Sequence, residues 1–256
     1  NSLSNTGTSN TWTDNETISG WYSNRLTYRA NDGSSNTGAI YSYGSADSTE
    51  RALGSVASGS TNTIYYAARF VNNSSEKITQ VSINFIGEQW RNGGNTSQHK
   101  LEFAYKIGAI DSLADNNFIP RNELDFISPI VGSTATALNG NATENQSILS
   151  DTFSVSLNIG EEIWFRWKDI NDGGSDHGLA IDNFDITFTG EVPTTATKLG
   201  ITSINQGISP FVNIPFDVVV KSFDNENNLA NVTQNTIIKL TLNTGNGLLE
   251  GNLIDT

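Results

Sequence analysis

Short apolar runs broken by polar turn residues constrain the fold of this chain more than any other feature. The runs have the length of β-strands and are separated by clusters of Gly, Asn, Asp and Ser, while helical spacing is almost absent. We expect strands at residues 38–45, 50–56, 62–72, 77–90, 100–108, 148–157, 161–170 and 179–189, and a short helix only within 111–126. Many strands at short spacing predict an all-β antiparallel sandwich and argue against a βαβ fold.

Composition excludes several classes of function. The 256-residue chain has 27 acidic and 14 basic residues and a formal net charge of −13, so it should repel nucleic acids and attract divalent cations. It contains no cysteine, which excludes disulfides and thiolate metal sites. No window approaches the roughly 18 apolar residues of a membrane-spanning helix. We therefore expect neither a nucleic-acid partner nor a membrane span.

The composition changes at EVPTTATKLGI, where a proline flanked by threonines predicts an extended linker at 191–198. Residues 199–256 contain the strand runs FDVVVKSF and TIIKLTL between polar turns, and resemble the bacterial immunoglobulin-like repeats of adhesins and invasins. Such a β-sandwich usually takes about 100 residues. We therefore expect an incomplete immunoglobulin-like domain that continues in a longer protein.

Residues 1–190 carry a second resemblance, in the series NSLSNTGTSNTW, GWY, SSNTGAIYSYGS, STERALGS, GEQWRNGG, LEFAYKIG and FRWKDINDGGSDHGLAIDNF. This series is similar, in order, to a domain of large secreted exoproteins of the Bacteroidota type, which belongs with concanavalin A-like and MAM-type jelly rolls. The resemblance implies a jelly-roll β-sandwich at 1–190 that acts as a non-catalytic module. It also implies a secreted or cell-surface protein, in which nuclease, lamin-tail-like or adhesion domains sometimes share the chain.

The loop between the last two expected strands of this domain is rich in oxygen ligands. It contains Asp169, Asn171, Asp172 and Asp176, and Ca²⁺ is a hard cation that takes roughly six to eight oxygen ligands. The order of these residues does not match an EF-hand loop, so calcium would have to recruit a second loop. The alternative is a solvated acidic turn between two strands.

Asp182 is an acid within an apolar strand. It shares the parity of Phe184, Ile186 and Phe188, which predicts a carboxylate that faces the core. A buried carboxylate must be paired or bound to a metal. Asp182 is therefore either a further calcium ligand or a buried aspartate held by a backbone turn or by one of Arg51, Arg69, Arg91 and Arg166.

Tryptophans alternate with core residues on two of the expected strands. In strand 161–170 the core set is Ile163, Phe165 and Trp167, so the residues between them face outward or toward a second layer. Indole rings stack on sugar rings and planar polar groups hold sugar hydroxyls. We expect a sugar-binding face that comprises Trp90, Glu88, Arg91, Trp164 and Arg166. The alternative is that a loop such as 20–28 covers one of the tryptophans.

Catalytic and zinc motifs are weak or missing. The sequence has no GxSxG, HExxH or phosphate-binding loop, and the ExDxE pattern of glucanases is absent. Glu88 and Glu102 stand alone on neighbouring strands and could form a hydrolytic pair only if the fold brought them together. Zinc at His177 would need His99 and carboxylates, and a histidine in a turn without metal is commoner.

Three tripeptides resemble the O-glycosylation pattern of the Bacteroidota. They are Asp47-Ser48-Thr49, Asp111-Ser112-Leu113 and Asp151-Thr152-Phe153. We expect Ser48, Ser112 and Thr152 as candidate sites, with Ser112 the first choice because it lies in a polar loop.

These observations predict a non-catalytic module, dependent on Ca²⁺, that binds a polysaccharide or cell-surface glycan as part of a secreted or surface protein. One alternative is a structural spacer of a surface filament, which burial of Trp90 and Trp164 would favour. Another is an accessory domain that targets a larger secreted hydrolase or nuclease.

Overall fold

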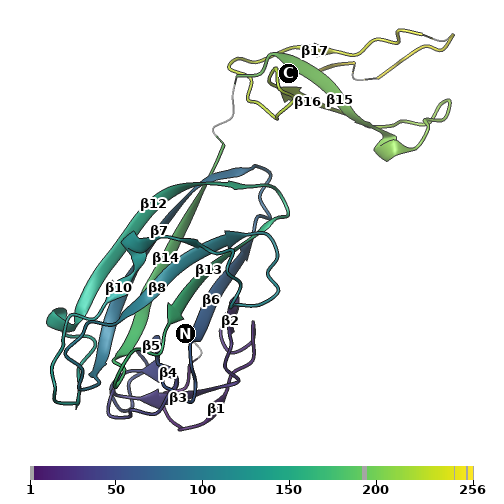
Figure 1. The fold of residues 1–256 in the computed structure, drawn as a ribbon. Coiled ribbons are helices and arrows are strands. Elements are labelled where there is room, and N and C mark those ends of the chain that lie inside the picture. Colours follow the sequence, from purple (N-terminus) through teal and green to yellow (C-terminus); the bar gives the residue numbers. More distant parts are fainter. Residues whose placement is uncertain (1–2, 192–194, 245, 252, 256) are drawn as a thin grey trace. The chain divides into compact units, whose positions relative to one another are not determined.

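The computed structural model describes residues 3–191, 195–244, 246–251 and 253–255. The chain divides into two compact units, Asn1–Glu191 and Val192–Thr256 (Figure 1). Of the linker expected at 191–198, residues 192–194 lie outside the described residues. The same holds for residues 1–2, 245, 252 and 256 of the two expected domains.

The first unit is an all-β sandwich of the jelly-roll kind. Its larger sheet has the strand order β1-β3-β4-β5-β14-β7-β11, and β12 also pairs with β7. These strands are β1 (Asn10–Thr11), β3 (Thr27–Asn31), β4 (Ala39–Tyr43), β5 (Ala52–Val56), β7 (Ile78–Asn92), β11 (Thr136–Ala137), β12 (Gln146–Leu157) and β14 (Gly178–Gly190). The pairing is antiparallel apart from β3 with β4, which run parallel.

The smaller sheet has the strand order β10-β8-β13-β6-β2, and β9 also pairs with β8. These strands are β2 (Trp21–Ser23), β6 (Ile64–Val71), β8 (Lys100–Ile107), β9 (Ile119–Pro120), β10 (Phe126–Ile127) and β13 (Glu162–Asp169). All the strands expected from the sequence are present near their expected bounds. Within 111–126 the structure has only a short 3₁₀ helix, η1 (Asn122–Leu124), and a second one, η2 (Thr143–Asn145), precedes β12.

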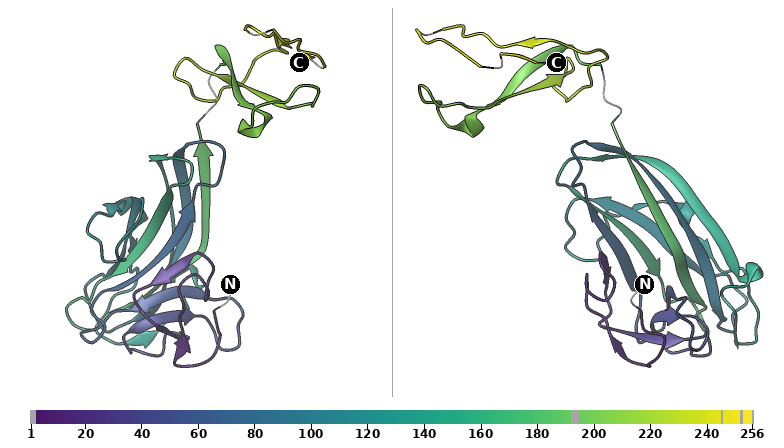
Figure 2. Two further views of the ribbon diagram at one scale, coloured as in Figure 1. Left: turned by 90° about the vertical axis from the view of Figure 1, so that its right-hand side faces the viewer. Right: turned by 180° about the vertical axis from the view of Figure 1, so that it is seen from behind.

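Apolar side chains of the two sheets meet in one core, and the views in Figure 2 show the sheets as facing layers. Ile163, Phe165 and Trp167, the predicted core set of β13, are fully buried there. The Trp167 ring packs edge-on against Phe85 of β7, with 5.6 Å between the ring centroids. Alternation along each strand turns the remaining side chains to the outer faces of the sandwich.

The strand β14 changes phase in its middle. Its pairing with β7 is interrupted between Asp182 and Asp185, which marks a β-bulge. Asn183 in the bulge has a φ of 51°, a left-handed conformation that asparagine tolerates better than most residues. Ile181 before the bulge and Phe184 after it both pack in the core, although simple alternation would put them on opposite faces.

The second unit consists of small two-stranded sheets in the described part. β15 (Lys198–Ile204) pairs with β16 (Val218–Phe223), β17 (Ile238–Lys239) pairs with β18 (Ile254–Asp255), and η3 (Asn205–Gly207) follows β15. Many of its large apolar side chains are exposed, among them Ile201, Phe211, Val212, Ile237 and Leu248. Its assignment as an incomplete immunoglobulin-like domain stays a prediction. Among the described residues of the whole chain, no helix is long and apolar enough to cross a membrane.

Candidate functional site

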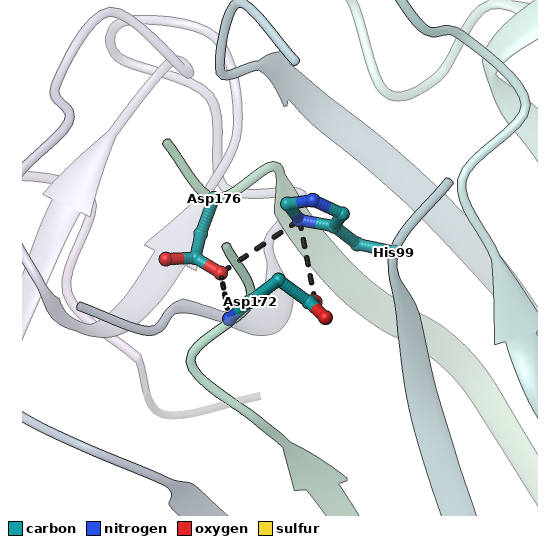
Figure 3. Close-up of side chains that lie close together, drawn as sticks. All are labelled: His99, Asp172 and Asp176. Atoms are coloured by element: carbon teal, nitrogen blue, oxygen red, sulfur yellow. Dashed lines mark hydrogen bonds and ion pairs between the residues drawn. The ribbon is translucent and has the colours of Figure 1, made fainter. Parts of the chain in front are cut away.

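The loops that follow β7 and β13 bring one histidine and two aspartates together (Figure 3). His99 Nδ1 lies 3.4 Å from Asp172 Oδ2 and 3.7 Å from Asp176 Oδ1. One nitrogen or oxygen atom from each residue lies within 4.8 Å of the others, a spacing that one metal ion could bridge. His99 and Asp176 are buried, and Asp172 is half-buried. We call these three residues the loop cluster.

Contacts between the two loops fix the backbone around the loop cluster. The Gly93 N–H donates a hydrogen bond to His177 Nδ1 at 2.9 Å, and His177 Nε2 lies 3.2 Å from the carbonyl oxygen of Ser97. A Cβ atom on residue 93 would lie 2.2 Å from the carbonyl oxygen of Asp176, so this close approach requires glycine. Both ring nitrogens of His177 therefore serve the backbone and not the cluster.

Asp169, the last residue of β13, adds a third carboxylate near the loop cluster. It is 3% exposed, and its Oδ2 has no hydrogen-bond partner among the described residues. Burial raises the pKa of Asp169 to about 8, with the charges of Asp176 and Asp172 adding to the effect. Burial likewise raises the pKa of Asp176 to about 6. In the described chain no lysine or arginine forms an ion pair with these carboxylates, and the partner of Asp172 and Asp176 is His99.

The structure therefore brings together two of the five metal ligands expected from the sequence, Asp172 and Asp176. Asp169 lies within electrostatic range of both, and Asn171 is exposed. Sequence reasoning did not assign His99 as a ligand, because it lies in a loop distant in the chain. The available signals were that calcium would need a second loop and that the chain has only two histidines.

The prediction that Asp182 faces the core is wrong. The bulge at Asn183 shifts the phase of β14, so Asp182 lies on the outer face beside Glu88 of β7 and Glu50. Burial raises the pKa of Asp182, and the neighbouring Glu50 adds to the effect. The neighbours of Asp182 are therefore carboxylates and not the loop cluster.

Trp90 and Glu88 lie on the outer face of β7, as expected, but beneath a loop. Each is 1% exposed, and Trp90 Nε1 donates to Glu88 Oε2 at 2.8 Å. The loop around Gly140 covers the indole so closely that a Cβ there would lie 2.2 Å from Trp90 Nε1. Arg91 is also buried and donates to the carbonyl oxygen of Gly33 at 3.0 Å. Burial raises the pKa of Glu88 to about 7.

Trp164 and Arg166 lie on the outer face of the other sheet, also under cover. Trp164 is 7% exposed and packs against Tyr22, with 4.8 Å between the ring centroids. Arg166 donates to the carbonyl oxygen of Leu113 at 2.8 Å and is 9% exposed. The predicted common face of Trp90 and Trp164 is therefore wrong, because the two indoles are buried and belong to different sheets. The stated alternative, a covering loop at 20–28, agrees with the position of Tyr22.

An open surface with polar side chains lies on the outer face of β12, β7 and β14. Residues directly opposite one another form the cross-strand rows Ser154–Gln80–Thr189, Thr152–Ser82–Thr187 and Ser150–Asn84–Asp185. We call these three rows the polar face; all of its side chains are exposed except half-buried Ser82. The second and third of these rows, together with Ile148, border an open groove of about 660 Å³. The polar face contains no basic and no aromatic residue.

The two glutamates considered for hydrolysis do not meet. Glu88 lies in the larger sheet, whereas Glu102 lies on β8 of the smaller sheet, where Lys168 donates to it at 2.8 Å. The salt bridge lowers the pKa of Glu102 against the opposing effect of burial. The arrangement needed for a glycosidase pair is therefore absent at these residues.

The candidate glycosylation residues occupy three different environments. Ser112 is exposed in the loop that also covers Arg166, and Ser48 is half-buried in the turn before β5. Thr152 is an exposed member of the polar face, and its hydroxyl lies 2.8 Å from that of Ser82. Ser112 therefore remains the first choice.

Comparison with protein-family models gives no match, and no curated protein matches the chain in sequence. Several solved structures are similar in fold. A CBM4 structure, where CBM denotes a carbohydrate-binding module, is 12% identical with a TM-score of 0.32 over 66% of this chain and 95% of that one. The K3 cleaved adhesin domain of Lys-gingipain from Porphyromonas gingivalis is 12% identical with a TM-score of 0.38 over 68% and 96%. The enzymatically active domain of bacteriophage CBA120 tailspike protein 4 is 12% identical with a TM-score of 0.33 over 74% and 21%. These likenesses concern the fold alone, so function is argued from the residues.

Proposed function

We propose that the first unit is a non-catalytic module that binds a polysaccharide or cell-surface glycan across the polar face. The observation that supports it best is the set of exposed hydroxyl and amide side chains in rows beside an open groove. Such groups both donate and accept hydrogen bonds, as sugar hydroxyls do. The lack of basic residues on this face favours a neutral glycan over an anionic one.

Binding of this kind is weak at a single site. A hydrogen bond that replaces one to water contributes about 0.5–1.5 kcal/mol, and no indole ring is available on the polar face. Five such bonds correspond to a Kd of about 0.003–15 mM. The assay must therefore present glycans at high density, so that several modules bind the same surface.

A glycan array probed with the full chain, with and without EDTA, tests the proposal. The double variant Asn84→Ala with Asp185→Ala removes the centre of the polar face and should lower affinity at least tenfold, about 1.4 kcal/mol. Asn73→Ala, an exposed asparagine in the turn between β6 and β7, is the matched control and should leave binding unchanged. Equal binding by the double variant and the control would reject the polar face as the site.

The proposal includes a divalent cation in the loop cluster, predicted from the sequence as calcium. Asp172 and Asp176 of the loop after β13 would hold it together with His99 of the loop after β7. Its role is structural, because it would join these two loops. A secreted or cell-surface location, a Bacteroidota-type source and the immunoglobulin-like domain at 199–256 also belong to this proposal.

A structural spacer is the second candidate, and the burial of Trp90 and Trp164 favours it. With both indoles covered, the unit lacks the aromatic platform that many sugar-binding surfaces use. The two candidates differ in one result. A spacer shows no glycan binding in either EDTA condition, whereas a binding module binds glycan without EDTA and loses this binding when the polar face is altered.

A further inference from the structure

We propose that the loop cluster selects a first-row transition cation such as Mn²⁺ or Zn²⁺ over Ca²⁺, with His99 as the ligand that sets this preference. The inference deepens the structural cation of the proposed function and rests on it. It does not depend on the polar face, so the two proposals can fail separately.

The positions of the ligand atoms fit a single ion. His99 Nδ1, Asp172 Oδ2 and Asp176 Oδ1 converge from two loops, at 3.4 Å and 3.7 Å from the nitrogen to the two oxygens (Figure 3). Ligand atoms bound at about 2.0–2.2 Å from zinc in tetrahedral geometry are separated by distances of this size. The convergence comes from the fold itself, because contacts such as that of Gly93 with His177 fix both loops.

Two backbone N–H groups donate into the loop cluster. The N–H of Asp172 donates to Asp176 Oδ1 at 2.8 Å, and that of His177 donates to His99 Nδ1 at 3.2 Å, which favours the tautomer with the lone pair on Nδ1. A cation bound by His99 Nδ1 would take the place of the longer of these two hydrogen bonds. It would also neutralise the charge of the two neighbouring carboxylates.

A buried oxygen provides a second, independent observation. Asp169 Oδ2 is buried without a hydrogen-bond partner among the described residues, and Asp169 lies within electrostatic range of Asp172 and Asp176. Buried polar atoms in folded proteins are nearly always paired, and an unpaired one calls for an ion or a water.

The chemistry of the ligand set decides the class of cation. Calcium takes roughly six to eight oxygen ligands, but one of the three atoms that converge here is a nitrogen of His99. Imidazole suits zinc and its transition-metal neighbours, and carboxylates suit manganese as well. One imidazole with two carboxylates therefore matches Mn²⁺ or Zn²⁺ better than Ca²⁺. Zinc considered from the sequence at His177 is instead expected at His99.

The test uses the full chain, stripped of metal with EDTA and then freed of EDTA. We expect Mn²⁺ and Zn²⁺ to bind at least tenfold more tightly than Ca²⁺ in calorimetric titrations. At a concentration about 100 times their Kd they should raise Tm by roughly 5–10 °C. Pulsed electron paramagnetic resonance of the Mn²⁺ form should show coupling to an imidazole nitrogen.

Variants separate ligation from folding. Asp172→Asn, at a half-buried position, should weaken Mn²⁺ binding at least tenfold, and His99→Gln should abolish the nitrogen coupling. Asp217→Asn, at an exposed aspartate of the second unit, is the matched control and should change neither. Tighter binding of Ca²⁺, or Mn²⁺ bound without nitrogen coupling, would overturn the proposed class of metal while leaving a structural cation in place. No binding of any of these cations would overturn both, whereas loss of glycan binding alone would leave this inference intact.

Discussion

Replacing Glu88 with glutamine should remove a pH dependence that this carboxyl group gives to the stability of the fold. Burial raises the pKa of Glu88 from 4.5 to about 7, and the charges of Asp182 on β14 and Glu50 before β5 add to the effect. Trp90 and Gln146 donate hydrogen bonds to its two oxygens at 2.8 Å and 3.1 Å. These donors favour the charged form but do not outweigh burial.

The sign of the effect comes from counting protons. Between pH 4.5 and about 7 the unfolded chain has lost the Glu88 proton while the folded protein keeps it. The folded state therefore binds more protons in this window, and the free energy of unfolding falls as pH rises through it. A difference of 2.5 between 4.5 and about 7, at about 1.4 kcal/mol for each pH unit, corresponds to about 3 kcal/mol lost above pH 7.

The variant Glu88→Gln cannot ionise, so its stability should not fall in this window. One of the two donors loses its acceptor, which removes about 1 kcal/mol. At pH 8 the variant should therefore exceed the wild type by about 2 kcal/mol, and at pH 4.5 it should be slightly less stable. Urea unfolding at pH 4.5, 6 and 8 measures the difference directly.

The matched control is Glu102→Gln, because salt bridges lower the pKa of Glu102 in the folded protein. This variant should be less stable than the wild type above pH 4.5, the opposite direction. If Glu88→Gln is no more stable than the wild type at pH 8, the carboxyl ionises normally inside the fold. The reasoning from burial would then be refuted.

Three further predictions concern the core, the bulge and the surface. Trp167→Ala should lower the free energy of unfolding by about 3–5 kcal/mol. The control Ile148→Ala, at a side chain that is 79% exposed, should change it by less than about 0.5 kcal/mol. Equal effects of the two variants in urea unfolding would contradict the assigned core. Asn183→Val should destabilise by about 1–3 kcal/mol because a β-branched residue resists positive φ, while Asn183→Gly should not. The intact mass of the native protein should exceed that of the polypeptide and return to it in Ser112→Ala; a bare mass in the native protein would reject the modification.

The strands and the core could be predicted from the sequence because both depend on local alternation. The core set around Trp167 follows from period-two spacing within one strand, and no information from elsewhere is needed. The same rule predicted the wrong face for Asp182, because period-two spacing assumes that strand pairing is continuous. The bulge at Asn183 interrupts this pairing, and a single asparagine is its only signal in the sequence. Short polar strands such as β2 and β3 were missed for lack of any periodic signal.

The candidate site was harder to predict because it depends on contacts between distant segments. Alternation correctly put Trp90 and Trp164 on outer faces, but it cannot tell whether a loop crosses over that face. The loop at Gly140 covers Trp90, and Tyr22 covers Trp164. Nothing in the sequence around Gly140 or Tyr22 indicates that it contacts a tryptophan. His99 meets the acidic loop because β7 pairs with β14 and β8 pairs with β13.

Strand β14 also determines how the first unit carries tension. It is hydrogen-bonded to β7 along most of its length and to β5 at its start, and its last residue, Gly190, leads toward the segment that joins the two units. Within the sandwich it exits at the end opposite β1 and β3 (Figures 1 and 2). A pull on the chain beyond Gly190, opposed by a hold on the N-terminal strands, therefore runs parallel to the strands. The backbone hydrogen bonds on both sides of β14 are then sheared together and do not open one by one, which makes this strand the mechanical anchor of the module.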